Sequence, residues 1–157
     1  MRRVRPPLIL LLLCALLSAC GGGSVRERVF PPTVSIQELA QQADGQWTLK
    51  LRLQNFSNVA MRFDAIEARV RVGSNDAGAV NLQPMLSVPP ESAEIVDFML
   101  MPAMGALNDV QAAAQGRGSV RYTLEGMIRS TEPDNRRDEF KFESQLSAVP
   151  GLSGVLR

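Results

Sequence analysis

The chain has 157 residues and a net charge of +1, from 17 basic and 16 acidic side chains. It contains no histidine, which excludes histidine-based acid–base catalysis, Ser-His-Asp and Cys-His constellations and imidazole metal sites. Its two cysteines, Cys14 and Cys20, lie within the first twenty residues, so the rest of the chain has no thiol nucleophile, disulfide or cysteine-bound zinc. The nearly balanced charge argues against a nucleic-acid partner.

Residues 1–19 have the pattern of an export signal. Arginines at positions 2, 3 and 5 precede an apolar run over 8–17. A membrane-spanning helix needs roughly 20 apolar residues, so this shorter run is typical of a secretory signal peptide. The run ends in Leu-Ser-Ala-Cys at 17–20, which resembles the bacterial lipobox, where signal peptidase II cleaves before a lipid-modified cysteine.

The lipobox resemblance implies that Cys20 carries a thioether-linked diacylglycerol and an acylated amine, and anchors the chain in a membrane. An aspartate after the cysteine favours inner-membrane retention in Gram-negative lipoproteins, but Gly21 stands there, so we expect an outer-membrane anchor facing the periplasm. The alternative is an ordinary signal peptide cleaved at another alanine, with Cys20 incidental. Cleavage before Cys20 removes three arginines and leaves 138 residues with a net charge of −2.

The remaining chain is predicted to consist of a flexible tether over 20–31, one domain over 32–147 and a tail over 148–157. Within the domain, apolar and polar side chains alternate with the period of half-buried strands. The clearest strand is WTLKLRLQ at 47–54, which follows the turn signal Asp-Gly at 44–45. Further strands are predicted over about 34–39, 61–72, 96–100, 119–128 and 140–146, with a weaker stretch over 77–88 and turns over 55–58, 73–76, 89–92 and 132–139.

One segment, 102–115, departs from the alternation. Four apolar residues there have helical spacing between Pro102 and Gly116, which predicts a short helix crossing one end of the sheets. These residues are Met104, Leu107, Val110 and Ala114. About seven short strands and one short helix predict an all-β fold, an antiparallel sandwich of immunoglobulin-like or fibronectin-like size.

Several motifs follow one another in a recognisable order. Asn-Phe-Ser-Asn at 55–58 ends a strand, Val-Pro-Pro-Glu-Ser-Ala-Glu at 88–94 precedes another, and Tyr-Thr-Leu-Glu-Gly-Met-Ile occupies 122–128. This layout resembles the second group of late embryogenesis abundant proteins, also called the water-stress and hypersensitive-response domain, over roughly 32–147. The family often has Asn-Pro-Asn where this chain has Asn-Phe-Ser-Asn, which lacks the proline. The resemblance implies a folded β-sandwich with a stress-related, non-enzymatic role.

The residues that match the family motifs are interpreted as structural. Asn55 and Asn58 are expected to satisfy backbone groups in their turn, and the Tyr122 hydroxyl should find a partner if it is buried. Gly126 within a strand indicates a bulge or a close approach of another backbone.

The methionines suggest a second kind of site. Met99 and Met101 lie on the face of their strand opposite Phe98, and with Met104 and Leu107 they either pack against the predicted helix or form an apolar surface or cleft that binds acyl chains. The carboxylate-rich run at 132–139 is interpreted as a solvated turn, with a calcium loop as the alternative. The apolar tail is expected to pack back on the sandwich or to dock on a partner.

Taken together, the sequence predicts a non-enzymatic outer-membrane lipoprotein with no catalytic, cofactor or metal residues. Its domain would protect against desiccation or other stress, or would bind proteins or membrane surfaces in the periplasm. The alternative is a lipid-binding or envelope-assembly accessory lipoprotein. The expected partners are the membrane, through the lipid anchor, and envelope proteins or lipids.

Overall fold

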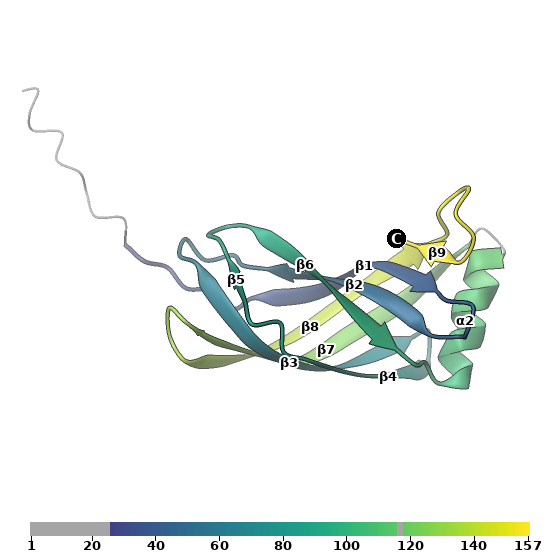
Figure 1. The fold of residues 1–157 in the computed structure, drawn as a ribbon, viewed down its shortest axis with the longest axis horizontal. Helices are drawn as coiled ribbons and strands as arrows, with labels where there is room; N and C mark the ends of the chain where they lie inside the picture. The colour runs from purple at the N-terminus through teal and green to yellow at the C-terminus, as the bar shows by residue number, and fades with distance from the viewer. Residues whose placement is uncertain (1–25, 116–117) are drawn as a thin grey trace, which may run out of the picture.

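The computed structural model describes residues 26–115 and 118–157. The predicted signal peptide, Cys20, the first part of the predicted tether and Gly116 lie outside the described residues. Two antiparallel β-sheets stack face to face, and a helix crosses one end of the stack (Figure 1). The residues that precede the first strand enter at the opposite end (Figure 1).

The prediction of an antiparallel all-β sandwich is confirmed. The four-stranded sheet has the order β6 (Ala93–Leu100), β2 (Trp47–Gln54), β1 (Thr33–Gln41), β9 (Val155–Leu156). The five-stranded sheet has the order β4 (Asn75–Leu82), β3 (Met61–Val72), β7 (Ser119–Glu132), β8 (Arg136–Ser147), and β5 (Leu86–Val88) also pairs with β3. One sheet thus contains β1, β2 and β6, and the other contains β3, β7 and β8. Strands A, B, E and C, F, G are divided in the same way in immunoglobulin-like sandwiches.

The alternation in the sequence explains the core between the sheets. In β2, Leu49, Leu51 and Leu53 are fully buried whereas Arg52 between them is exposed. Inward-facing residues of β3 and β7, among them Ile66 and the fully buried Leu124, meet them from the other sheet. Full burial of each such side chain stabilises the fold by about 1.5–3 kcal/mol, so the strand pattern specifies which face of each strand is buried.

The predicted helix is present as α2 (Met104–Gln115). It buries Ala106, Val110 and Ala113 and contacts β3, β4 and β7 of the five-stranded sheet. A glycine inside a helix costs about 1 kcal/mol relative to alanine, and the structure explains Gly105. A Cβ on Gly105 would lie 2.7 Å from the Asn75 side-chain oxygen, and the Asn75 amide donates to the Asp109 carboxylate at 2.9 Å.

Two boundaries differ from the sequence prediction. The turn expected over 132–139 is much shorter, because β7 extends to Glu132 and β8 already begins at Arg136, which pairs with Ser130. The weak stretch over 77–88 contains two strands, and β4 begins at Asn75 inside the predicted turn. In both places the strands have polar residues at positions where an apolar residue would be expected. The alternation of apolar and polar residues is therefore not visible in the sequence.

The tail packs back on the sandwich as β9. This strand pairs with Leu39 and Ala40 of β1, and on its other side Arg157 and Ser147 exchange backbone hydrogen bonds at 2.6 and 2.9 Å. Leu156 is fully buried between them. The last residues therefore join β1 of one sheet to the end of β8 in the other and close this side of the sandwich near α2.

Candidate functional site

The turn between β2 and β3 is organised by Asn55, which is fully buried. Its side-chain amide donates to the carbonyl oxygens of Val59, Val88 and Pro89 at 2.8, 3.2 and 3.0 Å. Its side-chain oxygen accepts the Ser57 amide hydrogen at 2.8 Å. Buried carbonyl groups need such partners, so Asn55 connects this turn to the loop between β5 and β6.

The next residues of the same turn hold the segment that enters the domain. The Asn58 side chain accepts the backbone amide hydrogen of Arg28 at 2.7 Å and donates to the Arg26 carbonyl oxygen at 2.9 Å. The backbone amide of Asn58 donates to the Arg28 carbonyl oxygen at 3.2 Å. The Ser57 hydroxyl accepts the Phe30 amide hydrogen at 2.9 Å. We refer to Ser57 and Asn58 with the segment 26–30 as the tether clasp.

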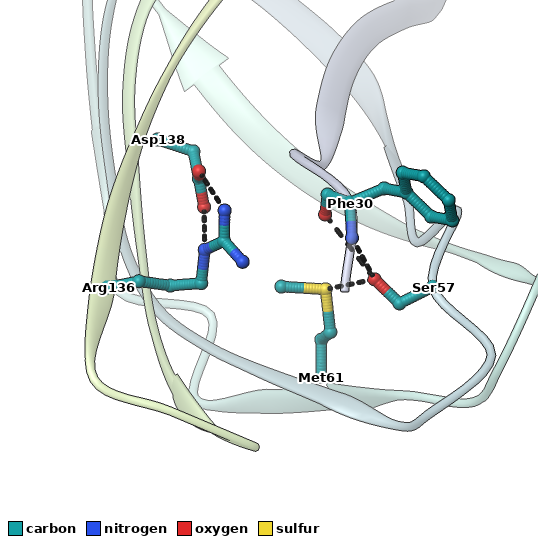
Figure 2. Close-up of polar contacts among 5 residues, drawn as sticks. All are labelled: Phe30, Ser57, Met61, Arg136 and Asp138. Carbon is teal, nitrogen blue, oxygen red and sulfur yellow. Dashed lines mark hydrogen bonds and ion pairs between the residues drawn. The ribbon is translucent and has the colours of Figure 1, made fainter. Parts of the chain in front are cut away.

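Figure 2 shows the inner side of the tether clasp. The Ser57 hydroxyl lies between the backbone of Phe30 and the sulfur of Met61, 3.3 Å from both the Phe30 carbonyl oxygen and that sulfur. Met61 is fully buried, so the clasp is attached to the core of the sandwich. The predicted tether over 20–31 is thus bound to the domain along its last residues, a contact that the sequence analysis did not anticipate.

Tyr122 of β7 links the two sheets. Its hydroxyl accepts the Ile36 amide hydrogen and donates to the Ile36 carbonyl oxygen, both at 3.1 Å. Ile36 lies in β1 of the opposite sheet, where the register shifts between Ile36 and Glu38. The hydroxyl therefore supplies a partner for both backbone groups of Ile36, next to the irregularity in β1. Burial raises the pKa of Tyr122, against the opposing effect of its bond to Ile36.

Gly126 of β7 lies where two backbones approach closely. It pairs with Ala68 of β3, and a Cβ at this position would collide with the Glu67 carbonyl oxygen and lie 2.5 Å from the Ala68 Cα. Only a residue without a side chain fits there. This geometry corresponds to the close approach that a glycine inside a strand indicates.

The methionines do not pack against the helix, so that prediction is wrong. Met99, Met101 and Met104 are 61, 63 and 72% exposed, and only Leu107 is partly buried against the core. The reason is that α2 covers the end of the five-stranded sheet, whereas Met99 lies on the outer face of β6, the edge strand of the other sheet. Their use as an apolar binding surface stays a prediction.

The two lysines lie in ion pairs. Lys50 is 3.4 Å from Glu38, whose other oxygen accepts from Arg157 at 2.6 and 2.7 Å. The hydrogen bond from Arg157, and then the charge of Lys50, hold the pKa of Glu38 below its usual value against the effect of burial. Lys141 pairs with Glu143 on the surface at 2.6 Å. The C-terminal side chain thus reinforces the backbone pairing of β9.

The structure also brings together polar residues inside the sandwich that sequence reasoning missed. Arg136 and Asp138 of β8 form a two-pronged ion pair with distances of 2.6 and 2.7 Å (Figure 2), and Asp138 is buried. The Asp138 carboxylate raises the pKa of Arg136. Ser130 beside them is fully buried, and within the described residues its hydroxyl has no hydrogen-bond partner. The spacing of two between Arg136 and Asp138 is typical of a strand, but the charged residues around them are typical of a turn.

Two findings concern ions and membranes. Over 26–115 and 118–157, no three acidic side chains are grouped so that they could hold a metal ion. The helix in those ranges is neither long nor apolar enough to span a membrane. The run at 132–139 is divided between a hairpin turn and two strands, and its carboxylates do not converge.

Comparison with known proteins gives structural neighbours only. No family model matches the sequence, and no curated protein matches it. A crystal structure of a protein from Archaeoglobus fulgidus is 16% identical and covers 78% of this chain and 98% of its own, with a TM-score of 0.42. A solution structure of a protein from Arabidopsis thaliana is 12% identical and covers 80% and 87%, with a TM-score of 0.47. A solution structure described as a candidate late embryogenesis abundant protein is 11% identical and covers 91% and 86%, with a TM-score of 0.43.

Proposed function

We propose that the protein is a lipid-anchored domain of the outer membrane that acts by binding or protecting proteins or membrane surfaces in the periplasm, without chemistry of its own. The observation that carries the proposal is the tether clasp. Asn58 forms three hydrogen bonds with the segment between the predicted lipobox and β1, so the domain binds the part of the chain that would lead to an anchor at Cys20.

The lipid anchor is tested by Cys20→Ala in the full chain. Labelling with a palmitate analogue should mark the wild-type protein and not the variant, and the variant should move from the membrane fraction to the soluble periplasm. Cys14→Ala is the matched control, because Cys14 leaves with the signal peptide if cleavage occurs before Cys20. Continued labelling of the Cys20→Ala protein would refute the anchor.

The sequence resemblance to the second late embryogenesis abundant group supports a role in water stress, and we propose this as the finer function. The domain should then preserve the activity of a dehydration-sensitive enzyme through drying or freezing better than an equal mass of inert protein. The Asn55→Ala variant is a suitable control, since its fold should be weakened while its composition is almost unchanged. Equal recovery with the inert protein would count against this role.

A second candidate function is supported by the exposed methionines on β6 and at the start of α2. Met99, Met101 and Met104 give this edge an adaptable apolar surface of the kind used for binding. An envelope-assembly or lipid-handling accessory would use it. Mass spectrometry of copurified lipids and proteins should then show a species that is lost from a Met99→Ser, Met101→Ser variant. Identical sets from both proteins would argue against this candidate.

A further inference from the structure

The exposed aromatic rings of the chain are gathered at the tether clasp. All eight aromatic side chains lie in the described residues, and six of them are buried or half-buried. The two that are exposed are Phe30 and Phe56, at 47 and 50%. Phe30 is bonded through its backbone to Ser57, and Phe56 is the residue that precedes Ser57. A single exposed ring needs no explanation, but two on neighbouring, hydrogen-bonded segments indicate a contact surface.

The covalent chain limits how far this turn can lie from the anchor. The clasp holds the backbone from Arg26 onward, so only the positions 20–25 separate the predicted anchor from the first clasped residue. Six residues from Cys20 to Arg26 span at most about 20 Å when fully extended. If Cys20 is held in a bilayer, the clasped backbone at Arg26 stays within roughly that distance of the lipid, and Phe30 follows four residues later on the same clasped segment.

We propose that Phe30 and Phe56 insert into the boundary between headgroups and acyl chains of the bilayer that carries the anchor, so that the tether clasp faces the membrane. This inference rests on the proposed anchoring at Cys20. Phenylalanine rings are suited to this boundary because they bury apolar area and carry no group that needs a partner. Arg26 and Arg28, both exposed beside the rings, can donate to lipid phosphates, and Glu27 offsets only one of these charges.

The short tether makes weak insertion sufficient. Docking of a domain that is already anchored is intramolecular, so two rings act at the high effective concentration that a short linker provides. The clasp also orients the domain, because it turns the β2–β3 turn toward the membrane and no other face of the sandwich. The opposite end, with α2 and the loop before β9, then points into the periplasm.

The test uses the full, lipidated protein in vesicles whose lipids carry bromine on their acyl chains, which quench nearby tryptophan. Phe56→Trp places a probe at the clasp, and Leu152→Trp places one in the exposed loop before β9, about 25 Å or more away along β1. The native Trp47 is fully buried and gives a constant background. Fluorescence from Trp at position 56 should fall at least twofold relative to unbrominated vesicles, while that from position 152 should not change.

The controls separate this inference from the anchoring proposal. Intact mass and flotation with the vesicles report acylation of Cys20, so a protein that fails to float contradicts the proposed function itself. A protein that floats but shows no quenching at position 56 overturns the membrane docking alone and leaves the anchoring proposal standing. Asn58→Ala in the Phe56→Trp background should float normally and lose much of the quenching. Undiminished quenching in that variant would overturn the orienting role of the clasp.

Discussion

The two ends of the sandwich are closed in different ways. At the helix end, α2 buries small apolar side chains and β9 joins the two sheets through backbone pairing around the buried Leu156. At the tether end, side chains of one turn hydrogen-bond the backbone of other segments, through Asn55, Ser57 and Asn58. The helix end therefore combines apolar burial with backbone pairing, and the tether end depends on hydrogen bonds from side chains.

This difference separates stability from orientation. Apolar burial is insensitive to direction, so changes at the helix end should alter the free energy of unfolding without moving the domain relative to its tether. The exposed hydrogen bonds of Asn58 to the backbone of 26–30 fix a direction at low energetic cost, because exposed bonds contribute little net stability. Substitution of Asn58 can therefore release the tether while the fold persists, whereas Asn55 and Ser57 are fully buried.

The largest effect is expected for Asn55→Ala. It leaves three carbonyl groups and the Ser57 amide without their partner in a buried place, so the free energy of unfolding should fall by about 3 kcal/mol. Urea unfolding measures it. The matched variant Asn58→Ala, on the exposed side of the same turn, should cost less than about 1 kcal/mol. Equal losses in the two variants would contradict the division of roles within the turn.

A loss of about the same size is expected at the helix end for Leu156→Ala. Truncation of this fully buried side chain would leave a cavity between the two sheets. Such a cavity typically lowers the free energy of unfolding by about 2–4 kcal/mol. Thermal or urea unfolding of the domain tests this, with Leu152→Ala in the exposed loop as the control, for which a change within about 0.5 kcal/mol is expected. A stable Leu156→Ala protein would mean that β9 is not part of the cooperative fold.

A smaller loss is expected where the sheets are linked by Tyr122. Tyr122→Phe keeps the ring but leaves the amide and carbonyl of Ile36 without partners, at a cost of about 1–2 kcal/mol. Hydrogen exchange adds a local readout, since the Ile36 amide should exchange faster in the variant. An unchanged exchange rate at Ile36 would show that the amide has another partner.

The smallest effect is a pH dependence from Glu38. Its pKa is lowered in the folded state, chiefly by Arg157, so its contribution to stability is present above the usual value of 4.5 and is lost as the pH falls through the folded value. Urea unfolding between pH 3 and 6 should therefore show a loss on acidification that is reduced in Glu38→Gln. Arg157→Ala, which keeps the carboxylate but removes its main partner, should also reduce it. The same slope in all three proteins would contradict this role.

The sequence was sufficient wherever one strand face is apolar and the other polar. Strands β2 and β3 and helix α2 followed directly from spacing, because burial of one face determines each of them. The alternation did not predict the start of β8, because Arg136 and Asp138 point inward there. Their pairing with each other is not visible in the pattern of single positions. The pattern also failed for Met104, because spacing identifies a helix but not which side of it meets the sheet.

For the candidate site, the sequence singled out residues that make structural contacts but did not indicate their partners. Asn55, Asn58, Tyr122 and Gly126 were all singled out, yet their contacts lie 30 to 86 positions away in the cases of Asn58 and Tyr122. Such long-range contacts depend on how the sheets stack, which local patterns do not encode. The hold of Asn58 on the tether is the clearest example, because the segment 26–30 has the composition of a linker.

The central claim is that the domain binds the chain segment that leads to the proposed anchor, and hydrogen exchange in the full chain tests it most directly. The amides of Arg28 and Phe30 donate to the side chains of Asn58 and Ser57. They should exchange at least about ten times more slowly than in a free chain, and Asn58→Ala should abolish the protection at Arg28. Exchange of both amides at the free-chain rate in the wild-type protein would contradict the account.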